Sequence, residues 1–250
     1  MMALLSSEEI ACMRQAGRAA ARILRKLGKC VRPGVATKYI EDSFDNYLKE
    51  YPGMESAFKG FMDYPASLCV SINDEVIHGI PSDKREIREG DLVSIDLGIK
   101  YKGLFVDTAY TYIAGRADKL ARKLVKATLK SLYAGIKKVK PQATIGDIGS
   151  TVQNFVENQG FAVVKQFVGH GIGRALHLPP EVPNFGTPGA GDKLFEGMAI
   201  AIEPMVTAGK YDVVVASDGW TAKTRDGSLS AHFEHTIAIT KKGPLILTRI

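Results

Sequence analysis

Two short stretches of the chain, Glu89–Asp96 (EGDLVSID) and Glu196–Glu203 (EGMAIAIE), share one pattern. Each starts with Glu-Gly, continues through mostly apolar residues and ends on a carboxylate. A short apolar run after a turn signal is typical of a buried strand. A charged group is costly to bury in such a strand unless it is paired. The pattern therefore predicts two buried strands that each deliver an acid to a common place.

A second correspondence extends the pattern into a repeat. Val31-Arg32-Pro33 matches Val139-Lys140-Pro141, and apolar residues at helical spacing follow both segments. The matching apolar residues are Ile40, Phe44, Tyr47 and Leu48 in the first half and Ile148, Val152, Phe155 and Val156 in the second. Units of one kind at nearly one spacing indicate duplication. We predict a single domain over residues 1–250, made of pseudo-repeats at about 7–112 and 116–250, because neither half alone would bury enough core.

The composition favours an intracellular globular protein. The chain has 250 residues, 45% of them hydrophobic, and we find no apolar run long enough to cross a bilayer. The first ten residues lack the basic start of a secretory signal. Three scattered cysteines indicate a reducing compartment. We therefore expect a cytoplasmic protein without a membrane partner, and the net charge of +6 identifies no partner by itself.

Four acids lie in the predicted apolar strands: Asp96, Asp107, Glu203 and Glu234. A turn over residues 98–103 would bring Asp96 and Asp107 onto one face of a hairpin. Glu234 is expected inside a strand over residues 232–237. For any single acid, an exposed strand end is the simpler explanation. For all four together we predict a metal site, because no Lys or Arg interrupts the strand cores to neutralise them.

The histidines complete the candidate metal site. His78, His170 and His177 lie beside glycine or proline signals, whereas His232 and His235 are expected to be structural. His235 should point away from the face of Glu234 in a regular strand. One imidazole with four carboxylates suits Mn²⁺, Fe²⁺, Co²⁺ or Zn²⁺. Because several of these carboxylates could each bind two metal ions at once, the set suits two ions about 3.5–4 Å apart.

Two glycine patterns do not predict nucleotide binding. Gly169, Gly171 and Gly173 follow a strand-like run, but Pro179-Pro180 would stop the helix that a dinucleotide fold needs. The segment 186–193 lacks the Gly-Lys-Ser/Thr ending of a phosphate-binding loop and predicts a surface loop.

Several motifs together resemble the type I methionine aminopeptidases over essentially the whole chain from about Ser7. They are Met13-Arg14-Gln15-Ala16-Gly17, His78-Gly79-Ile80-Pro81, Ser94-Ile95-Asp96-Leu97-Gly98, Gly169-His170-Gly171-Ile172-Gly173, Ile202-Glu203-Pro204-Met205 and Phe233-Glu234-His235. The resemblance implies an α+β pita-bread fold, in which two pseudo-symmetric halves surround a central antiparallel sheet. The chain resembles the short bacterial form. It lacks a long insertion between His177 and Glu203, and it lacks a zinc-binding extension before Ser7.

The resemblance also implies a set of site residues and two divalent metal ions, which could be Co, Mn, Fe or Zn. The implied metal ligands are Asp96, Asp107, His170, Glu203 and Glu234, with Asp107 and Glu234 bridging. The implied catalytic residues are Glu203, His177 and His78. The implied substrate-binding residues are His78, Phe61, Tyr64, Cys69, Leu176, His177 and Trp220. Phe58, Phe61 and Leu176 depart from common family residues, which bears on the shape of the pocket.

The implied activity is removal of the initiator methionine from nascent polypeptide N-termini that carry a small second residue. A proline-specific peptidase of the same fold, a metal-free relative that binds nucleic acid or ribosomes, and a non-catalytic metal-binding module are the alternatives. The full ligand set argues against the metal-free relative. We expect no DNA partner.

A basic segment over residues 116–140 predicts contact with the ribosome, although a solvated helix face explains it equally well. Its basic residues are Arg116, Lys119, Arg122, Lys123, Lys126, Lys130, Lys137, Lys138 and Lys140.

Overall fold

The computed structural model describes residues 4–249, and in each half two α-helices precede the strands. The first half contains α1 (Ser7–Gly28), α2 (Thr37–Leu48), β1 (Met54–Ser56), η1 (Phe61–Asp63), β2 (Cys69–Ile72), β3 (Glu75–Ile77), β4 (Leu92–Tyr101) and β5 (Leu104–Ile113). The second half contains α3 (Lys119–Ile136), α4 (Ile145–Glu157), β6 (Ala162–Val163), β7 (Gly169–Gly171), β8 (Leu178–Val182), β9 (Ala199–Ile202), β10 (Met205–Thr207), β11 (Val213–Val215), β12 (Ala222–Thr224), β13 (Ser230–His232), β14 (His235–Thr240) and β15 (Gly243–Ile246).

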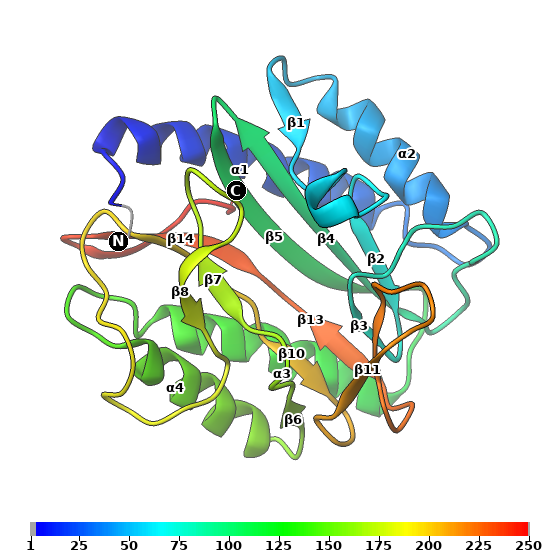
Figure 1. Cartoon of the computed structure of the whole chain (residues 1–250). Helices are drawn as coiled ribbons and strands as arrows, with labels where there is room; N and C mark the ends of the chain where they lie inside the picture. The colour runs from blue at the N-terminus through cyan, green and yellow to red at the C-terminus, as the bar shows by residue number, and fades with distance from the viewer. Residues whose placement is uncertain (1–3, 250) are drawn as a thin grey trace.

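The helices begin where local capping chemistry predicts. The Ser6 hydroxyl accepts from the Glu9 N–H, and the Glu9 carboxylate accepts from the Ser6 N–H, which is a capping box. Helix α1 ends at Gly28. Thr144 and Asp147 form the same reciprocal cap at the start of α4. Each helix has one buried apolar face. Figure 1 shows α1 and α2 above the strands and α3 and α4 below them.

Strands β4 and β5, of ten residues each, form a continuous hairpin in the first half. The sequence expectation of a turn over residues 98–103 was wrong, because β4 continues to Tyr101 and Lys102-Gly103 alone make the connection. Lys102 and Gly103 both have positive φ, as a two-residue hairpin turn requires. Strands β1 and β2 also pair with β4 and extend this sheet to four strands.

The strands of the second half are shorter and more divided. Strands β15, β14, β9, β7 and β8 pair in that order, while β13, β10 and β6 form a separate sheet. The predicted single strand over residues 232–237 is therefore wrong. It divides into β13, which pairs with β10, and β14, which pairs with β9. Phe233 and Glu234 form the break, because the chain leaves one partner strand and joins another there.

Threonine side chains join the two halves along β5. The Thr236 hydroxyl accepts from the Asp107 N–H and donates to the Asp107 carbonyl, both at 2.8 Å. Thr108 donates to the Glu234 carbonyl, and Thr111 donates to the His232 carbonyl. These bonds replace a regular ladder where β5 meets β13 and β14. The acids of the two halves are consequently brought together at one seam.

Each half contributes its own apolar core. One core lies under α1 and α2 and includes Ile23, Phe44 and Ile95. The other lies under α3 and α4 and includes Leu124 and Val152. The architecture confirms the α+β fold class with antiparallel strands, whereas the predicted repeat boundaries at 112 and 116 stay a prediction. In the described part of the chain, the helices are too short or too polar to cross a membrane.

Candidate metal centre and substrate pocket

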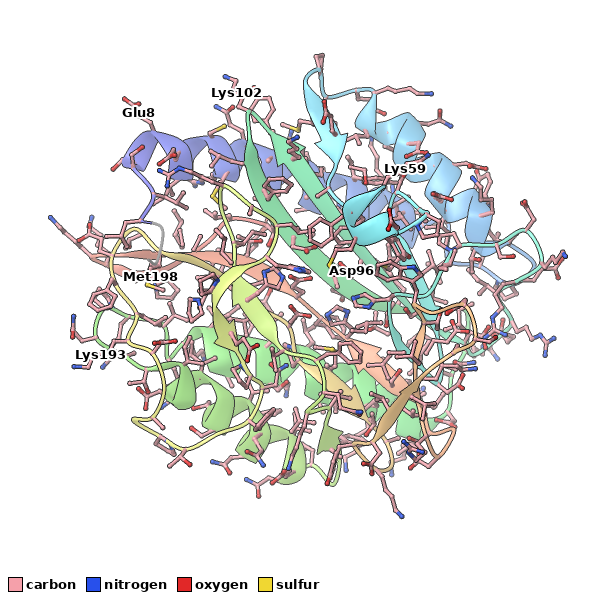
Figure 2. The ribbon with its side chains drawn as sticks, in the orientation of Figure 1. Glu8, Lys59, Asp96, Lys102, Lys193 and Met198 are labelled. Atoms are coloured by element: carbon pink, nitrogen blue, oxygen red, sulfur yellow. The ribbon has the colours of Figure 1, made fainter. Side chains whose placement is uncertain are left out.

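A cavity of about 320 Å³ lies between the two halves, and every site residue implied by the sequence lines it. These residues are Phe61, Tyr64, Cys69, His78, Asp96, Asp107, His170, Leu176, His177, Glu203, Trp220 and Glu234. Figure 2 shows Asp96 near the centre of the ribbon, whereas Glu8, Lys102 and Lys193 lie at the periphery. The lining combines four carboxylates with histidines and apolar or aromatic side chains.

The backbone register explains how the four acids converge. Asp96 lies opposite Ala109 and Asp107 lies opposite Gly98, so the two aspartates are diagonal neighbours on one face of the hairpin. His235 pairs with Ile202, which places Glu203 and Glu234 one residue beyond the same end of the β9–β14 pair. All four side chains are buried, and Glu234 is only 2% exposed.

Burial makes this arrangement unfavourable for four free anions. Desolvation raises the pKa of Asp96 to about 7. The pKa values of Asp107, Glu203 and Glu234 are raised well above the usual range, first by desolvation and then by the charges of neighbouring acids. Within residues 4–249, Asp96 Oδ1 and Glu234 Oε1 are buried without a hydrogen-bond partner. Bound cations would satisfy these oxygens and offset the repulsion.

The tautomer of His170 points to the same conclusion. His170 Nδ1 lies 2.9 Å from the carbonyl oxygen of Gly171, so Nδ1 carries the proton. Burial lowers the pKa of His170 to about 4, so the ring is neutral at pH 7 and Nε2 presents a lone pair. Nε2 lies 3.6 Å from Glu203 Oε1. A lone pair therefore faces a carboxylate, which is the geometry of two ligands around a cation.

The donor atoms of three candidate ligands also lie close enough together to bind one metal ion. Donor atoms of Asp107, His170 and Glu234 lie within 4.8 Å of one another. Together with Asp96 and Glu203, these residues form the oxygen-rich donor set that suits divalent transition metals. The residues present therefore fit a divalent metal centre.

Two further histidines border the centre. The His177 ring lies 4.2 Å from that of His170, centroid to centroid, and meets Phe61 edge-on at 5.1 Å. The His78 ring packs edge-on against Phe167 and Trp220. Burial lowers the pKa of His78 to about 4, so its ring is a neutral hydrogen-bonding group at pH 7.

The apolar pocket adjoins the acids directly. Cys69 on β2 lies opposite Asp96 on β4. Tyr64 packs edge-on against Trp220 at 5.0 Å, and its hydroxyl donates toward the Gly79 carbonyl at 3.1 Å. Buried Leu176 closes another side of the pocket. The space next to the acids can therefore accept an unbranched apolar side chain.

The sequence prediction missed several lining residues at the mouth. Met62, Phe167, Val215 and Gly219 also line the cavity. Met62 is 74% exposed and has a positive φ of 49°, and its apolar side chain gave no periodic signal that could have identified it. Phe58 also lines the cavity. In the sequence it stands out only as a departure from the common family residue.

His232 was expected to be only structural, yet it lies against the site. Its Nε2 is 3.7 Å from Glu203 Oε2, and burial lowers its pKa to about 3. His235 behaves as expected, because its ring nitrogens meet Tyr133 and Thr248 on the other side of the strand. Strand alternation would have placed His232 on the face of Glu234, so a signal for its position was present in the sequence.

Known proteins share this fold and much of this sequence. The model of metallopeptidase family M24 matches residues 11–241. A methionine aminopeptidase of Clostridium perfringens is 46% identical over 250 residues, and methionine aminopeptidase 1 of Bacillus subtilis is 42% identical over 250 residues; in both cases the match covers the whole of each chain.

Solved structures agree with the sequence matches. The crystal structure of a methionine aminopeptidase from Thermotoga maritima superposes with a TM-score of 0.98 at 45% identity and covers 100% of both chains. A prolidase from Pyrococcus horikoshii superposes with a TM-score of 0.79 at 23% identity over 98% of this chain and 63% of that one, which shows a shared fold alone. This chain therefore belongs to metallopeptidase family M24 and, within it, to the methionine aminopeptidases.

Proposed function

We propose that this protein removes the initiator methionine from nascent polypeptides whose second residue is small. The observation that carries the proposal is that one cavity contains both a candidate metal centre and an apolar pocket. A lone pair of His170 faces Glu203 among four buried acids, and an apolar pocket lined by Tyr64, Cys69 and Trp220 opens beside them. The names of the relatives that match over the full length support the same activity.

We propose that the centre holds two divalent ions. Asp107 and Glu234 would contact both ions, Asp96 would complete one position, and His170 with Glu203 would complete the other. Two such ions supply an activated water and polarise the scissile carbonyl. Co, Mn, Fe and Zn all suit this donor set.

The protein's own groups have separate roles in this proposal. The Glu203 carboxylate accepts a proton from the attacking water and passes it to the leaving amine. A ring N–H of His177 donates a hydrogen bond to the carbonyl oxygen as negative charge develops there. His78 orients the scissile amide. Burial in the cavity strengthens these interactions, because water does not compete with them.

The pocket accounts for the proposed selectivity. Methionine is unbranched and polarizable, which suits a pocket built from aromatic rings and a thiol. The free α-amine of the substrate would be held at the acidic centre, so only a terminal residue could be cleaved. A bulky second residue would collide with the walls that hold the acids.

Peptide hydrolysis tests the proposal directly. Protein loaded with metal should release methionine from Met-Ala-Ser and leave N-formyl-Met-Ala-Ser and N-acetyl-Met-Ala-Ser intact. It should hydrolyse Leu-Pro and Phe-Pro dipeptides poorly. Efficient cleavage of the Xaa-Pro dipeptides would favour a proline-specific enzyme, and equal cleavage of blocked peptides would contradict the amine-binding role.

We further propose that residues 116–140 dock this enzyme on the ribosome, where its substrates emerge. All nine basic side chains of the segment are exposed, and Lys119, Lys126 and Lys130 lie along α3. Reversing these three charges should weaken co-sedimentation with ribosomes and reduce its dependence on salt. Reversal of exposed Lys241 and Lys242 is the matched control. An unchanged profile for the α3 variant would leave a solvated helix face as the explanation.

The proposed location is the cytoplasm, where nascent chains are made. The three cysteines are free, with Cys30 and Cys69 buried, which suits a reducing compartment. Fractionation of native cells with an antibody to this chain tests the location.

A further inference from the structure

The imidazole of His232 is a buried polar group beside the candidate metal centre, and the proposed mechanism gives it no role. His232 ends β13 and is only 1% exposed. Among the described residues, neither Nδ1 nor Nε2 has a hydrogen-bond partner. A neutral imidazole carries one donor and one acceptor, and leaving both unsatisfied in a buried place costs free energy. Such a group is retained more readily when it has a task in the loaded site.

The backbone of His232 is held firmly. The Thr111 hydroxyl accepts from the His232 N–H at 2.9 Å and donates to the His232 carbonyl at 2.8 Å. His232 also pairs with Met205 of β10. The imidazole is therefore presented from a fixed position and not from a loose loop.

The Glu203 carboxylate is the polar group that this imidazole faces. Glu203 Oε1 lies 3.6 Å from His170 Nε2, and Glu203 Oε2 lies 3.7 Å from His232 Nε2. Asn184 donates to the Glu203 backbone carbonyl, but no hydrogen bond to the carboxylate itself is found in residues 4–249. The main chain of Glu203 is thus fixed, whereas the direction of its carboxylate depends on the two imidazoles.

We infer that His232 is a positioning residue whose Nε2–H donates a hydrogen bond to Glu203 Oε2 and directs Oε1 toward the metal centre. The imidazoles of His170 and His232 would then present different groups to the Glu203 carboxylate. His170 carries its proton on Nδ1 and offers a lone pair, whereas His232 offers a proton. A movement of less than about 1 Å would bring the 3.7 Å separation into hydrogen-bond range. This inference rests on the proposed role of Glu203 as a ligand.

Metal titration of the whole chain tests the inference without relying on activity alone. Mn²⁺ affinity would be measured by calorimetry on metal-free wild type, His232→Leu and His232→Gln. Loss of the donor in His232→Leu should weaken Mn²⁺ binding by about 10- to 100-fold. His232→Gln, whose amide can also donate, should bind within a few-fold of wild type. With Met-Ala-Ser as substrate, His232→Leu should lower kcat with little change in KM.

Two reference variants make each outcome decisive. His235→Leu removes a buried histidine that contacts Tyr133 and Thr248 and should leave Mn²⁺ affinity near the wild-type value. Glu203→Ala should lose affinity if Glu203 is a ligand. If Glu203→Ala still binds Mn²⁺ normally, the proposed ligand set fails. If Glu203→Ala loses affinity and His232→Leu does not, only the role of His232 is overturned.

The glutamine variant separates a donor from other roles. If His232→Gln binds Mn²⁺ as poorly as His232→Leu, the donor role is overturned in favour of direct ligation or imidazole shape. A purely structural role predicts reduced thermal stability with unchanged Mn²⁺ affinity in the folded protein, which would also overturn the inference. His232→Met replaces His232→Leu as the apolar variant if the latter does not fold.

Discussion

The two halves deliver their carboxylates by different means. Asp96 and Asp107 lie within the continuous β4–β5 hairpin, so the ladder itself fixes their short side chains. Glu203 and Glu234 lie just beyond the β9–β14 pair, where the ladder has ended. Asn184 and Thr108 donate to the backbone carbonyls of Glu203 and Glu234, so these bonds do not fix the direction of the longer carboxylate side chains. A duplicated architecture can therefore place similar groups with different rigidity.

The break in the second half contains one acid of the site and directly follows His232. Residues 233–234 separate β13 from β14, and this division brings His232 and Glu234 to the same centre. In a regular strand His232 and Glu234 would share a face, whereas here they lie at the point where the chain changes partner strands. The first half needs no comparable support, because its acids lie on one regular face.

The largest expected effect comes from Glu234→Ala. Removing this acid takes an oxygen donor from both proposed ion positions, so bound metal should fall together with activity. The loss of kcat/KM should exceed the roughly 10³-fold upper range for one lost oxyanion donor. Elemental analysis and steady-state kinetics on identically purified protein measure both quantities. Retention of two ions per chain would contradict the bridging role.

His177→Ala should fail in a different way. His177 is proposed to contact the developing oxyanion and not the ions, so metal content should remain near that of wild type. The rate should fall by roughly 10²–10³-fold, mainly in kcat. A variant that loses metal as Glu234→Ala does would show that His177 is a ligand.

The contribution of Asp96 to the stability of the metal-free protein should fall as pH rises. Burial raises the pKa of Asp96 from its usual 3.8 to about 7, so the folded state binds more protons than the unfolded state between these values. The stabilising contribution is present below about pH 4 and is lost toward pH 7, at up to about 1.4 kcal/mol per pH unit for one such group. Urea unfolding across this window measures it. Buried histidines such as His170 and His232 have lowered pKa values and act in the opposite direction, so the quantity to compare is the free energy of unfolding of wild type minus that of Asp96→Asn. This difference should fall from pH 4 to pH 7, and a difference that rises would contradict the argument.

A smaller effect is expected at the seam between the halves. Thr236→Val removes the hydroxyl that serves both the N–H and the carbonyl of Asp107, so the free energy of unfolding should fall by about 1–3 kcal/mol. Thr151→Val is the matched control, because the Thr151 hydroxyl bonds within its own helix to the Asp147 carbonyl. Equal losses in the two variants would show that the seam has no special role.

Local patterns were sufficient for much of the fold. The capping box at Ser6, the end of α1 at Gly28 and the apolar face of α2 follow from interactions within one turn of helix. The buried strands that carry Asp96 and precede Glu203 could be predicted because a Glu-Gly turn signal comes before each, although β4 continues past Asp96 to Tyr101. The twelve proposed site residues were assigned through motifs that resemble a known family, and the cavity contains all of them.

Sequence alone determined which chemical groups this protein has and the local elements that carry them, since helix periodicity, caps and apolar runs depend on neighbours along the chain. Only the tertiary structure decided the diagonal placement of Asp96 and Asp107, the break before Glu234 and the approach of His232 to Glu203. The physical reason is that strand register and partner exchange depend on packing between residues that are distant in sequence. A shift of one residue in register would turn an acid from the cavity to the core.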